Sequence, residues 1–200
     1  MSSFIVLEGI DGSGKTTQTK LIEKKLKFSA KEAIIVREPG GTSLGELVRN
    51  ILKTEKDLDP LTQLLLFSSC RRELIHKVIK PALLQNQNII CDRYIYSTLV
   101  YQGLAQGLKL ADIHNVISLS TDNIVPDLII FIDTPPEIAK SRRINGTDDT
   151  FDNKDLQFFQ SLRKGYLEIA DKTENWFSID GTKPISEIEK DIWNKVEPLL

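Results

Sequence analysis

Eight residues near the amino terminus have the types and spacing of a phosphate-binding loop, G-x-x-x-x-G-K-[ST]: Gly9-Ile10-Asp11-Gly12-Ser13-Gly14-Lys15-Thr16. Glycines let the backbone adopt positive φ angles and approach phosphate oxygens. Successive amide groups then form an anion nest at the start of the next helix. In this pattern Lys15 reaches the β- and γ-phosphates, and the Thr16 hydroxyl binds Mg²⁺. The loop therefore predicts a nucleotide site.

The elements around the loop are those that such a loop requires, a strand before it and a helix after it. Residues 4–7 are typical of a buried parallel strand, and residues 18–28 have apolar side chains on one helical face. We expect further strands at 32–37, 88–92, 127–133 and 176–180, and helices at 43–52, from 59 to Pro81, from Tyr94 through Gln102, and at 110–119, 134–143, 156–169 and 184–196. This alternation predicts an α/β fold with a doubly wound, five-stranded parallel sheet flanked by helices.

Some helix ends carry their own signals. Ser43 is expected to cap the helix it begins, and Asp59-Pro60 has the types of an N-cap and first helical residue. Pro81 is expected to bend or end its helix, and Gly103 and Gly107 to interrupt theirs.

Composition and charge narrow the class of protein. The chain has 200 residues, 40% of them hydrophobic, which is enough for one domain over residues 1–200 with a full core. A net charge of -2 argues against a nucleic-acid partner held by broad positive charge. No apolar run approaches the ~20 residues needed to cross a bilayer, and no signal peptide is apparent. Two cysteines without metal-site spacing suit a reducing compartment, so we expect a cytoplasmic protein without a membrane partner.

Charged residues follow several of the predicted strands. In an open α/β sheet, ligands bind at the carboxyl ends of the strands, where the phosphate loop, residues 37–42, Asp92-Arg93 and Asp133-Thr134 would meet. Arginines facing a phosphate loop indicate a second anion, and hence a phosphorylated acceptor such as a nucleotide kinase binds. Asp92 and Asp133 each end a strand, and spacing alone does not decide which of them serves Mg²⁺.

Taken together, the motifs of this chain resemble those of the bacterial thymidylate kinases. The matching segments follow the order of that family: residues 8–17, Arg37-Glu38-Pro39-Gly40-Gly41-Thr42, Leu66-Phe67 with Arg71-Arg72-Glu73, Asp92-Arg93-Tyr94 and Tyr101-Gln102-Gly103. The resemblance implies a P-loop NTPase-type fold with a short lid and a homodimer. It also implies Mg²⁺-dependent transfer of the ATP γ-phosphoryl group to dTMP, with Gly9 to Thr17 holding ATP.

The resemblance also implies residues for the acceptor. Phe67 and Arg71 share a helix face; by resemblance the first stacks on thymine and the second bonds its O4. Without the resemblance, a core phenylalanine and a solvated arginine would be the simpler interpretation. By resemblance, Gln102 reads thymine N3 and Tyr101 occupies the place of a ribose 2′-hydroxyl. The other acceptor-pocket residues implied are Glu38, Pro39, Arg49, Cys70, Arg93 and Ser97, and Arg49 and Arg93 bind the phosphate.

For the chemistry itself, the resemblance implies Lys15, Asp11, Arg93, Arg142 and Arg143 as catalytic residues. Asp11 would bond the deoxyribose 3′-hydroxyl; a turn-stabilising aspartate is the alternative. The family pattern favours Asp92, with Thr16, for Mg²⁺. A lid of about residues 142–153 should supply positive charge, because Gly12 stands where one subtype of the family has an arginine. Thr150 and Cys70 depart from the family pattern, which leaves open the lid arginine and one contact to the base.

Two other functions are worth weighing. A GTP-driven switch would need an N-K-x-D motif after a strand, and neither Asn153-Lys154-Asp155-Leu156 nor Asn194-Lys195-Val196-Glu197 fits. A kinase for another nucleotide, such as dUMP, CMP or AMP, would share the layout and is the alternative within the enzymes.

Overall fold

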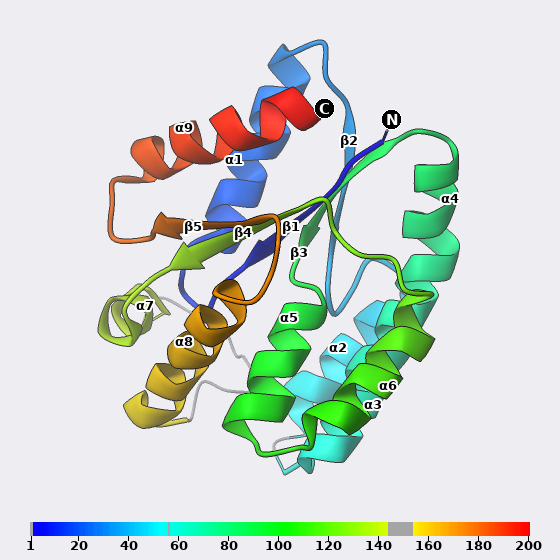
Figure 1. Cartoon of the computed structure of the whole chain (residues 1–200), viewed down its shortest axis with the longest axis vertical. Coiled ribbons are helices and arrows are strands. Elements are labelled where there is room, and N and C mark those ends of the chain that lie inside the picture. The colour runs from blue at the N-terminus through cyan, green and yellow to red at the C-terminus, as the bar shows by residue number, and fades with distance from the viewer. Residues whose placement is uncertain (1, 56, 144–153) are drawn as a thin grey trace.

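The computed structural model describes residues 2–55, 57–143 and 154–200. Its centre is one sheet of five parallel strands in the order β2-β3-β1-β4-β5 (Figure 1). The strands are β1 (Phe4–Glu8), β2 (Ala33–Arg37), β3 (Asn88–Asp92), β4 (Leu128–Asp133) and β5 (Trp176–Asp180). The predicted fold class is thus confirmed. Strands β2 and β3 lie on one side of β1, and β4 and β5 lie on the other. The connections therefore diverge beside β1, which is where a ligand is expected in such a sheet.

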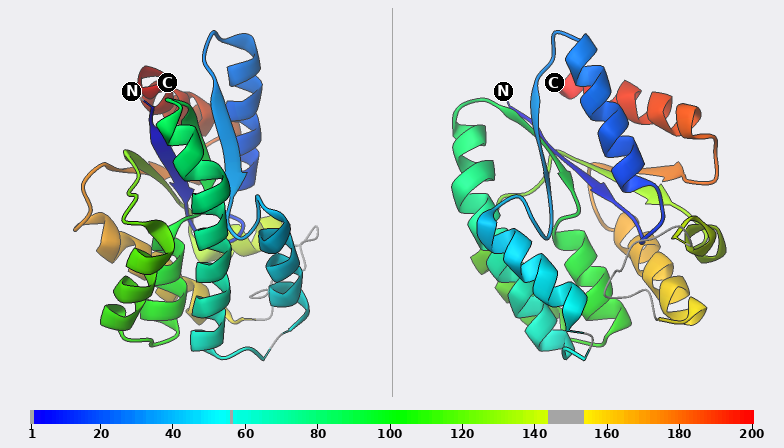
Figure 2. Two further views of the ribbon diagram at one scale, coloured as in Figure 1. Left: turned by 90° about the vertical axis from the view of Figure 1, so that its right-hand side faces the viewer. Right: turned by 180° about the vertical axis from the view of Figure 1, so that it is seen from behind.

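The alternation of β1 side chains divides the core into two layers. Ile5 and Leu7 pack in the layer that contains the apolar faces of α1 (Lys15–Phe28) and α9 (Ile185–Val196). Figure 2 shows these two helices side by side on one face of the sheet. Phe4 and Val6 pack on the opposite face. Because the three central strands, β1, β3 and β4, are covered on both faces, they are almost continuously apolar, as buried parallel strands usually are.

The opposite face carries the remaining helices: α2 (Ser43–Thr54), α3 (Pro60–Leu74), α4 (Lys80–Leu84), α5 (Ile95–Thr98), α6 (Leu110–Thr121), α7 (Pro136–Arg143) and α8 (Leu156–Ala170). A π-helical turn, Ile75–Ile79, joins α3 to α4, and a second one, Leu99–Ala105, extends α5. Among the described residues, no helix is both long enough and apolar enough to cross a membrane.

The ends of several helices differ from the sequence prediction. The helix does not end at Pro81 but continues to Leu84. The wide turn before it absorbs the proline, since Lys80 donates to Ile75 five residues back and the ring meets a less crowded turn. Gly103 does not interrupt its helix either. A Cβ there would lie 2.9 Å from Leu110, so this glycine permits close packing of α6.

The capping predictions had mixed outcomes. Asp59 caps α3 as predicted, because its side chain accepts from the amides of Leu61 and Thr62. The cap of α2 is Thr42 and not Ser43: the Thr42 hydroxyl accepts from the Gly45 amide at 3.0 Å. Both residue types can cap, and only the backbone geometry distinguishes neighbours.

Candidate functional site

The phosphate loop connects β1 to α1 at the carboxyl edge of the sheet. Gly9, Gly12 and Gly14 all have positive φ angles, of 150°, 83° and 106°, which L-residues with a Cβ rarely adopt. Lys15 is the first residue of α1, and its ammonium donates to the carbonyls of Gly9 at 2.9 Å and Ile10 at 3.0 Å. Burial and the nearby charge of Arg93 lower the pKa of Lys15 to about 8. The lysine is therefore held over the loop in an electropositive setting suited to an anion.

Thr16 and Asp92 meet beside this loop. The Thr16 hydroxyl donates to Asp92 Oδ2 at 3.3 Å, and Asp92 Oδ1 is buried without a hydrogen-bond partner in the described part of the chain. Asp133, the other strand-end acid, accepts from two nitrogens of Arg163 at 2.6 and 2.9 Å. One free carboxylate oxygen next to a hydroxyl is the kind of hard-oxygen donor set that Mg²⁺ uses together with phosphates and waters.

Arg93 stands opposite Lys15. It has a φ of 73°, directly after β3, and this turn aims its guanidinium back at the phosphate loop. It donates to the Gly9 carbonyl at 2.9 Å and to Ser97 Oγ at 2.8 Å, and it forms a salt bridge with Asp11. Lys15 and Arg93 thus share one carbonyl acceptor, which concentrates two positive charges at the mouth of the loop.

Asp11 joins this cluster from inside the loop. The Tyr101 hydroxyl donates to Asp11 Oδ2 at 2.8 Å, while Arg93 holds Oδ1. Burial acts to raise the pKa of Asp11, but the charges of Arg93 and Lys15 outweigh it and the pKa is lowered. Asp11 is therefore an ionised side chain between Arg93 and Tyr101. The structure brings Asp11 to Arg93 and Tyr101, which lie 82 and 90 residues further along the chain.

Sequence reasoning missed Glu8, which is the centre of the polar network behind Arg93. This fully buried carboxylate accepts from the amides of Tyr94 at 2.9 Å and Ser97 at 3.2 Å. It also accepts from Ser97 Oγ at 2.7 Å and from the hydroxyl of Tyr166, in α8, at 3.0 Å. Burial raises the pKa of Glu8. The signal available in the sequence was an acidic residue at the end of an apolar strand.

Glu8 thereby takes the place of a helix cap. The residue before α5 has no side-chain cap of its own, and Glu8 accepts from the amides at the start of that helix. Because Ser97 in turn accepts from Arg93, Glu8 holds both the helix and the arginine in position.

Arg71 and Glu38 form a buried ion pair on the side of the site toward α3. Arg71 is 2% exposed and donates through Nε to Glu38 Oε2 at 2.8 Å. Its Nη2 donates to Thr98 Oγ1 at 3.0 Å and to the Tyr94 carbonyl at 3.3 Å. Arg71 Nη1 and Glu38 Oε1 have no hydrogen-bond partner among the described residues. The pair is therefore fixed, and Arg71 Nη1 can still donate a hydrogen bond to a ligand and Glu38 Oε1 can still accept one.

The neighbouring predicted residues lie around this pair. Arg49, in α2, donates to the carbonyl of Pro39 at 3.1 Å, which ties α2 to the loop after β2. Cys70 is buried, at 1% exposure, in a small apolar cluster with Val48 and Leu52, and Phe67 packs against that cluster. Burial raises the pKa of the Cys70 thiol to about 11, so the thiol is neutral.

Three glutamines meet between α3 and the second π-helical turn. Gln63 donates to the carbonyl of Leu58 at 2.8 Å, and its Oε1 accepts from Gln102 at 3.3 Å and from Gln106 at 3.1 Å. Gln63 and Gln102 are both buried. Sequence reasoning singled out Gln102 and missed Gln63, because a glutamine in a helix carries no local signal of its partner.

The two lid arginines differ. Arg142 donates to the carbonyl of Gly181 at 2.9 Å and to that of Ser13 at 3.5 Å, so it spans the phosphate loop and the turn after β5. Arg143 lies over the ring of Phe159, with its guanidinium carbon 4.0 Å from the centroid. A Cβ on Gly12 would lie 2.2 Å from the carbonyl of Ala139 and 3.0 Å from Arg143, so α7 packs directly on the loop. Residues 144–153 of the predicted lid, Thr150 among them, fall outside the described residues.

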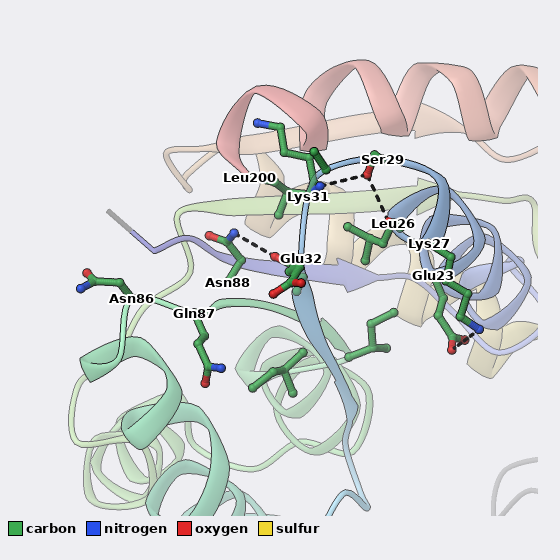
Figure 3. Close-up of a pocket in the computed structure, with 14 residues that line it drawn as sticks. Glu23, Leu26, Lys27, Ser29, Lys31, Glu32, Asn86, Gln87, Asn88 and Leu200 are labelled. Atoms are coloured by element: carbon green, nitrogen blue, oxygen red, sulfur yellow. Dashed lines mark hydrogen bonds and ion pairs between the residues drawn. The ribbon is translucent and has the colours of Figure 1, made fainter.

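A separate hollow of about 930 Å³ lies at the opposite edge of the sheet (Figure 3). It is bounded by the end of α1, edge strand β2, the turn before β3 and Leu200. None of the predicted site residues lines it. It lies at the starts of β2 and β3, and because the strands are parallel, the phosphate loop at the end of β1 lies at the other end of the sheet.

The loop glycines, Lys15 and the Thr16–Asp92 pair lie at the carboxyl edge of a parallel sheet, with arginines across from them. This combination defines a P-loop phosphotransferase whose second ligand is also an anion. The chain belongs to the thymidylate kinase family: the family model "Thymidylate kinase" matches residues 7–192.

Relatives match almost from end to end. The chain is 41% identical over 199 residues to the thymidylate kinase of Caldanaerobacter subterraneus subsp. tengcongensis, which covers 98% of this chain and 96% of the relative. It is 38% identical over 198 residues to that of Thermosipho africanus (98% and 98%), and 36% identical over 196 residues to that of Deinococcus radiodurans (96% and 95%). The resemblance noted from the motifs is thereby confirmed.

Proposed function

We propose that this protein transfers the γ-phosphoryl group of ATP to dTMP, giving dTDP and ADP, in the synthesis of dTTP. Membership of the thymidylate kinase family supports this function. The observation that carries the chemistry is the convergence of Lys15 and Arg93 on the Gly9 carbonyl. Two cations at one point suit a reaction in which two phosphorylated ligands meet.

On the ATP side, residues Gly9 to Thr17 bind the phosphates and Lys15 neutralises the β- and γ-phosphates. Mg²⁺ would be held by Asp92 and Thr16, whose free carboxylate oxygen and hydroxyl fit it, and when bound it supplies charge neutralisation. Arg142 and Arg143 lie beside the phosphate loop, and we assign them the role of neutralising the negative charge that develops on the transferred group. Arg142 donates to a loop carbonyl, that of Ser13.

On the dTMP side, Arg93 and Arg49 bind the acceptor phosphate, and Asp11 bonds the 3′-hydroxyl. Tyr101, held by Asp11, blocks the place of a 2′-hydroxyl. The base stacks on Phe67, with O4 at Arg71 Nη1 and N3 at Gln102. The wall of the pocket is completed by Glu38, Pro39, Cys70 and Ser97. The unpartnered Nη1 of a fixed, buried arginine supports the O4 contact.

The chemistry then needs positioning and no covalent enzyme intermediate. An oxygen of the acceptor phosphate is already ionised at neutral pH, so it attacks in line without a general base. Lys15, Arg93 and the lid arginines offset the negative charge, and lid closure excludes water.

The test is ADP release with ATP and Mg²⁺ across dTMP, dUMP, dCMP, CMP, AMP and GMP, with a reaction lacking acceptor as control. We expect strong preference for dTMP. Preference for another monophosphate would leave the phosphate chemistry intact and refute the base-pocket assignments. Equal ADP release without acceptor would indicate a nucleotide hydrolase and refute the kinase.

We also propose a homodimer. Exposed aliphatic side chains on two neighbouring helices support it: Leu44, Leu47 and Ile51 on α2, and Leu61 and Leu65 on α3. A second copy would cover them, since lone apolar side chains are common on surfaces but clusters mark interfaces. Light scattering coupled to size exclusion should give twice the chain mass, and Leu47→Asp should give the monomer mass. A wild-type monomer at micromolar concentration would refute the assembly.

A further inference from the structure

The orientation of the buried Gln102 amide is determined by a buried residue of another helix, Gln63. Gln63, in α3, donates through its Nε2 to the main-chain carbonyl of Leu58 at 2.8 Å. A main-chain carbonyl can only accept, so the amide of Gln63 has one orientation that satisfies this bond. Its Oε1 must therefore face the other way, toward the second π-helical turn.

The same logic passes to the next residue. Gln63 Oε1 accepts from Gln102 Nε2 at 3.3 Å and from Gln106 Nε2 at 3.1 Å, and both lone pairs of this oxygen are thereby used. Gln102 must present its NH₂ group to Gln63, so its own Oε1 points away from Gln63. No hydrogen bond to that oxygen forms within the part of the chain that the structure describes.

The backbone reinforces this arrangement. Gln102 lies in the π-helical turn Leu99–Ala105, where Gln106 donates its amide to the Tyr101 carbonyl five residues back and Leu108 donates to the Gln102 carbonyl at 3.1 Å. Gln102 is 1% exposed and Gln63 6% exposed. Reversal of the Gln102 amide would place two oxygens against each other in a buried setting, which is costly.

We propose that Gln63 is a specificity-determining positioning residue, which holds Gln102 as a pure acceptor toward the acceptor base. An acceptor there rewards a ring N–H, which thymine and uracil have at N3, and opposes cytosine, whose N3 carries a lone pair. The Leu58 carbonyl orients the Gln63 amide, and Gln63 orients the Gln102 amide. The preference for a base with a ring N–H thus depends on this chain of two hydrogen bonds. This inference rests on the proposed contact between Gln102 and the base.

The experiment compares kcat/KM for dTMP and dCMP at saturating ATP. Gln63→Met removes donor and acceptor at nearly constant volume and leaves Gln102 free to rotate, and Gln63→Ala is a second variant with the same loss. We expect the dTMP/dCMP ratio to fall about 10-fold in both, as one hydrogen bond permits. The KM for ATP should be unchanged, whereas a general disturbance of the fold would alter it.

A control isolates the orientation effect. Gln106→Leu removes the other donor to Gln63 Oε1 and leaves the Leu58–Gln63–Gln102 chain, so it should keep the wild-type ratio within about 2-fold. The proposal is overturned if Gln63→Met and Gln63→Ala keep the wild-type ratio, or if Gln106→Leu lowers it as far as they do.

Failure of the underlying base contact is recognised separately. Gln102→Leu should lower the dTMP/dCMP ratio at least as far as Gln63→Met. An unchanged ratio in Gln102→Leu would refute the contact between Gln102 and the base. A lowered ratio in Gln102→Leu with an unchanged ratio in both Gln63 variants would refute only the role of Gln63.

Discussion

Replacing Arg71 with methionine should destabilise the protein in a way that depends on pH. The change removes the partner of Glu38, which is 6% exposed and whose other carboxylate oxygen has no hydrogen-bond partner among the described residues. Burial already raises the pKa of Glu38, against the charge of Arg71. Breaking a buried pair from one side costs about 3–5 kcal/mol because it strands the other charge.

Protonation of Glu38 sets an upper limit to that cost. Glu38 can take up a proton in the folded variant, and this costs about 1.4 kcal/mol for each pH unit above its ordinary pKa of 4.5. The limit is therefore about 5 kcal/mol at pH 8 and about 2 kcal/mol at pH 6. Because the folded variant binds the proton more tightly than the unfolded chain does, stability falls as pH rises from 4.5 through the folded pKa.

The assay is urea unfolding of wild type and Arg71→Met at pH 6 and pH 8, followed by tryptophan fluorescence. We expect the loss of unfolding free energy relative to wild type to be about 2–3 kcal/mol larger at pH 8. The double variant Glu38→Gln with Arg71→Met has no carboxylate to strand, so its loss relative to wild type should not be larger at pH 8 than at pH 6. Equal losses at pH 6 and pH 8 in the single variant would refute the reasoning.

Three further outcomes are expected. Lys15→Ala should lower kcat about 100- to 1000-fold with an unchanged far-UV circular dichroism spectrum, and a smaller loss would mean that another group neutralises the phosphates. Gly107 has a φ of 81° and open space where a Cβ would lie, so Gly107→Ala should lower the free energy of unfolding by about 1 kcal/mol. Gly12 has a similar φ of 83°, but its Cβ would meet the Ala139 carbonyl, so Gly12→Ala should lower it clearly more. Equal losses of the two variants in urea unfolding would contradict this packing. Glu8→Gln should lower stability by about 2–3 kcal/mol, because an NH₂ group then faces donors such as Ser97, and a near-neutral change in thermal unfolding would count against Glu8 as the centre of that network.

Sequence alone determined the strands, most of the helices and the phosphate loop of this protein. These features depend on local patterns: continuous apolar runs in the strands, a period of 3.6 residues in the helices, and glycines whose backbone freedom is needed within one short loop. The same locality explains why Asp59 was identified as a cap, since its partners, Leu61 and Thr62, are two and three residues away.

Tertiary structure decided which side chains meet. Strands β3 and β4 both flank β1, so strand order alone does not choose between Asp92 and Asp133. Side-chain contacts do: Asp92 accepts from Thr16, whereas Asp133 is engaged by Arg163. The Pro81 helix continued past its proline because a π-helical turn accommodates it. The partners of Glu8 and Gln63 were not visible in the sequence, because strand order and helix packing bring them together. Hydrogen bonds between distant residues leave no spacing in a sequence, so only the fold could reveal them.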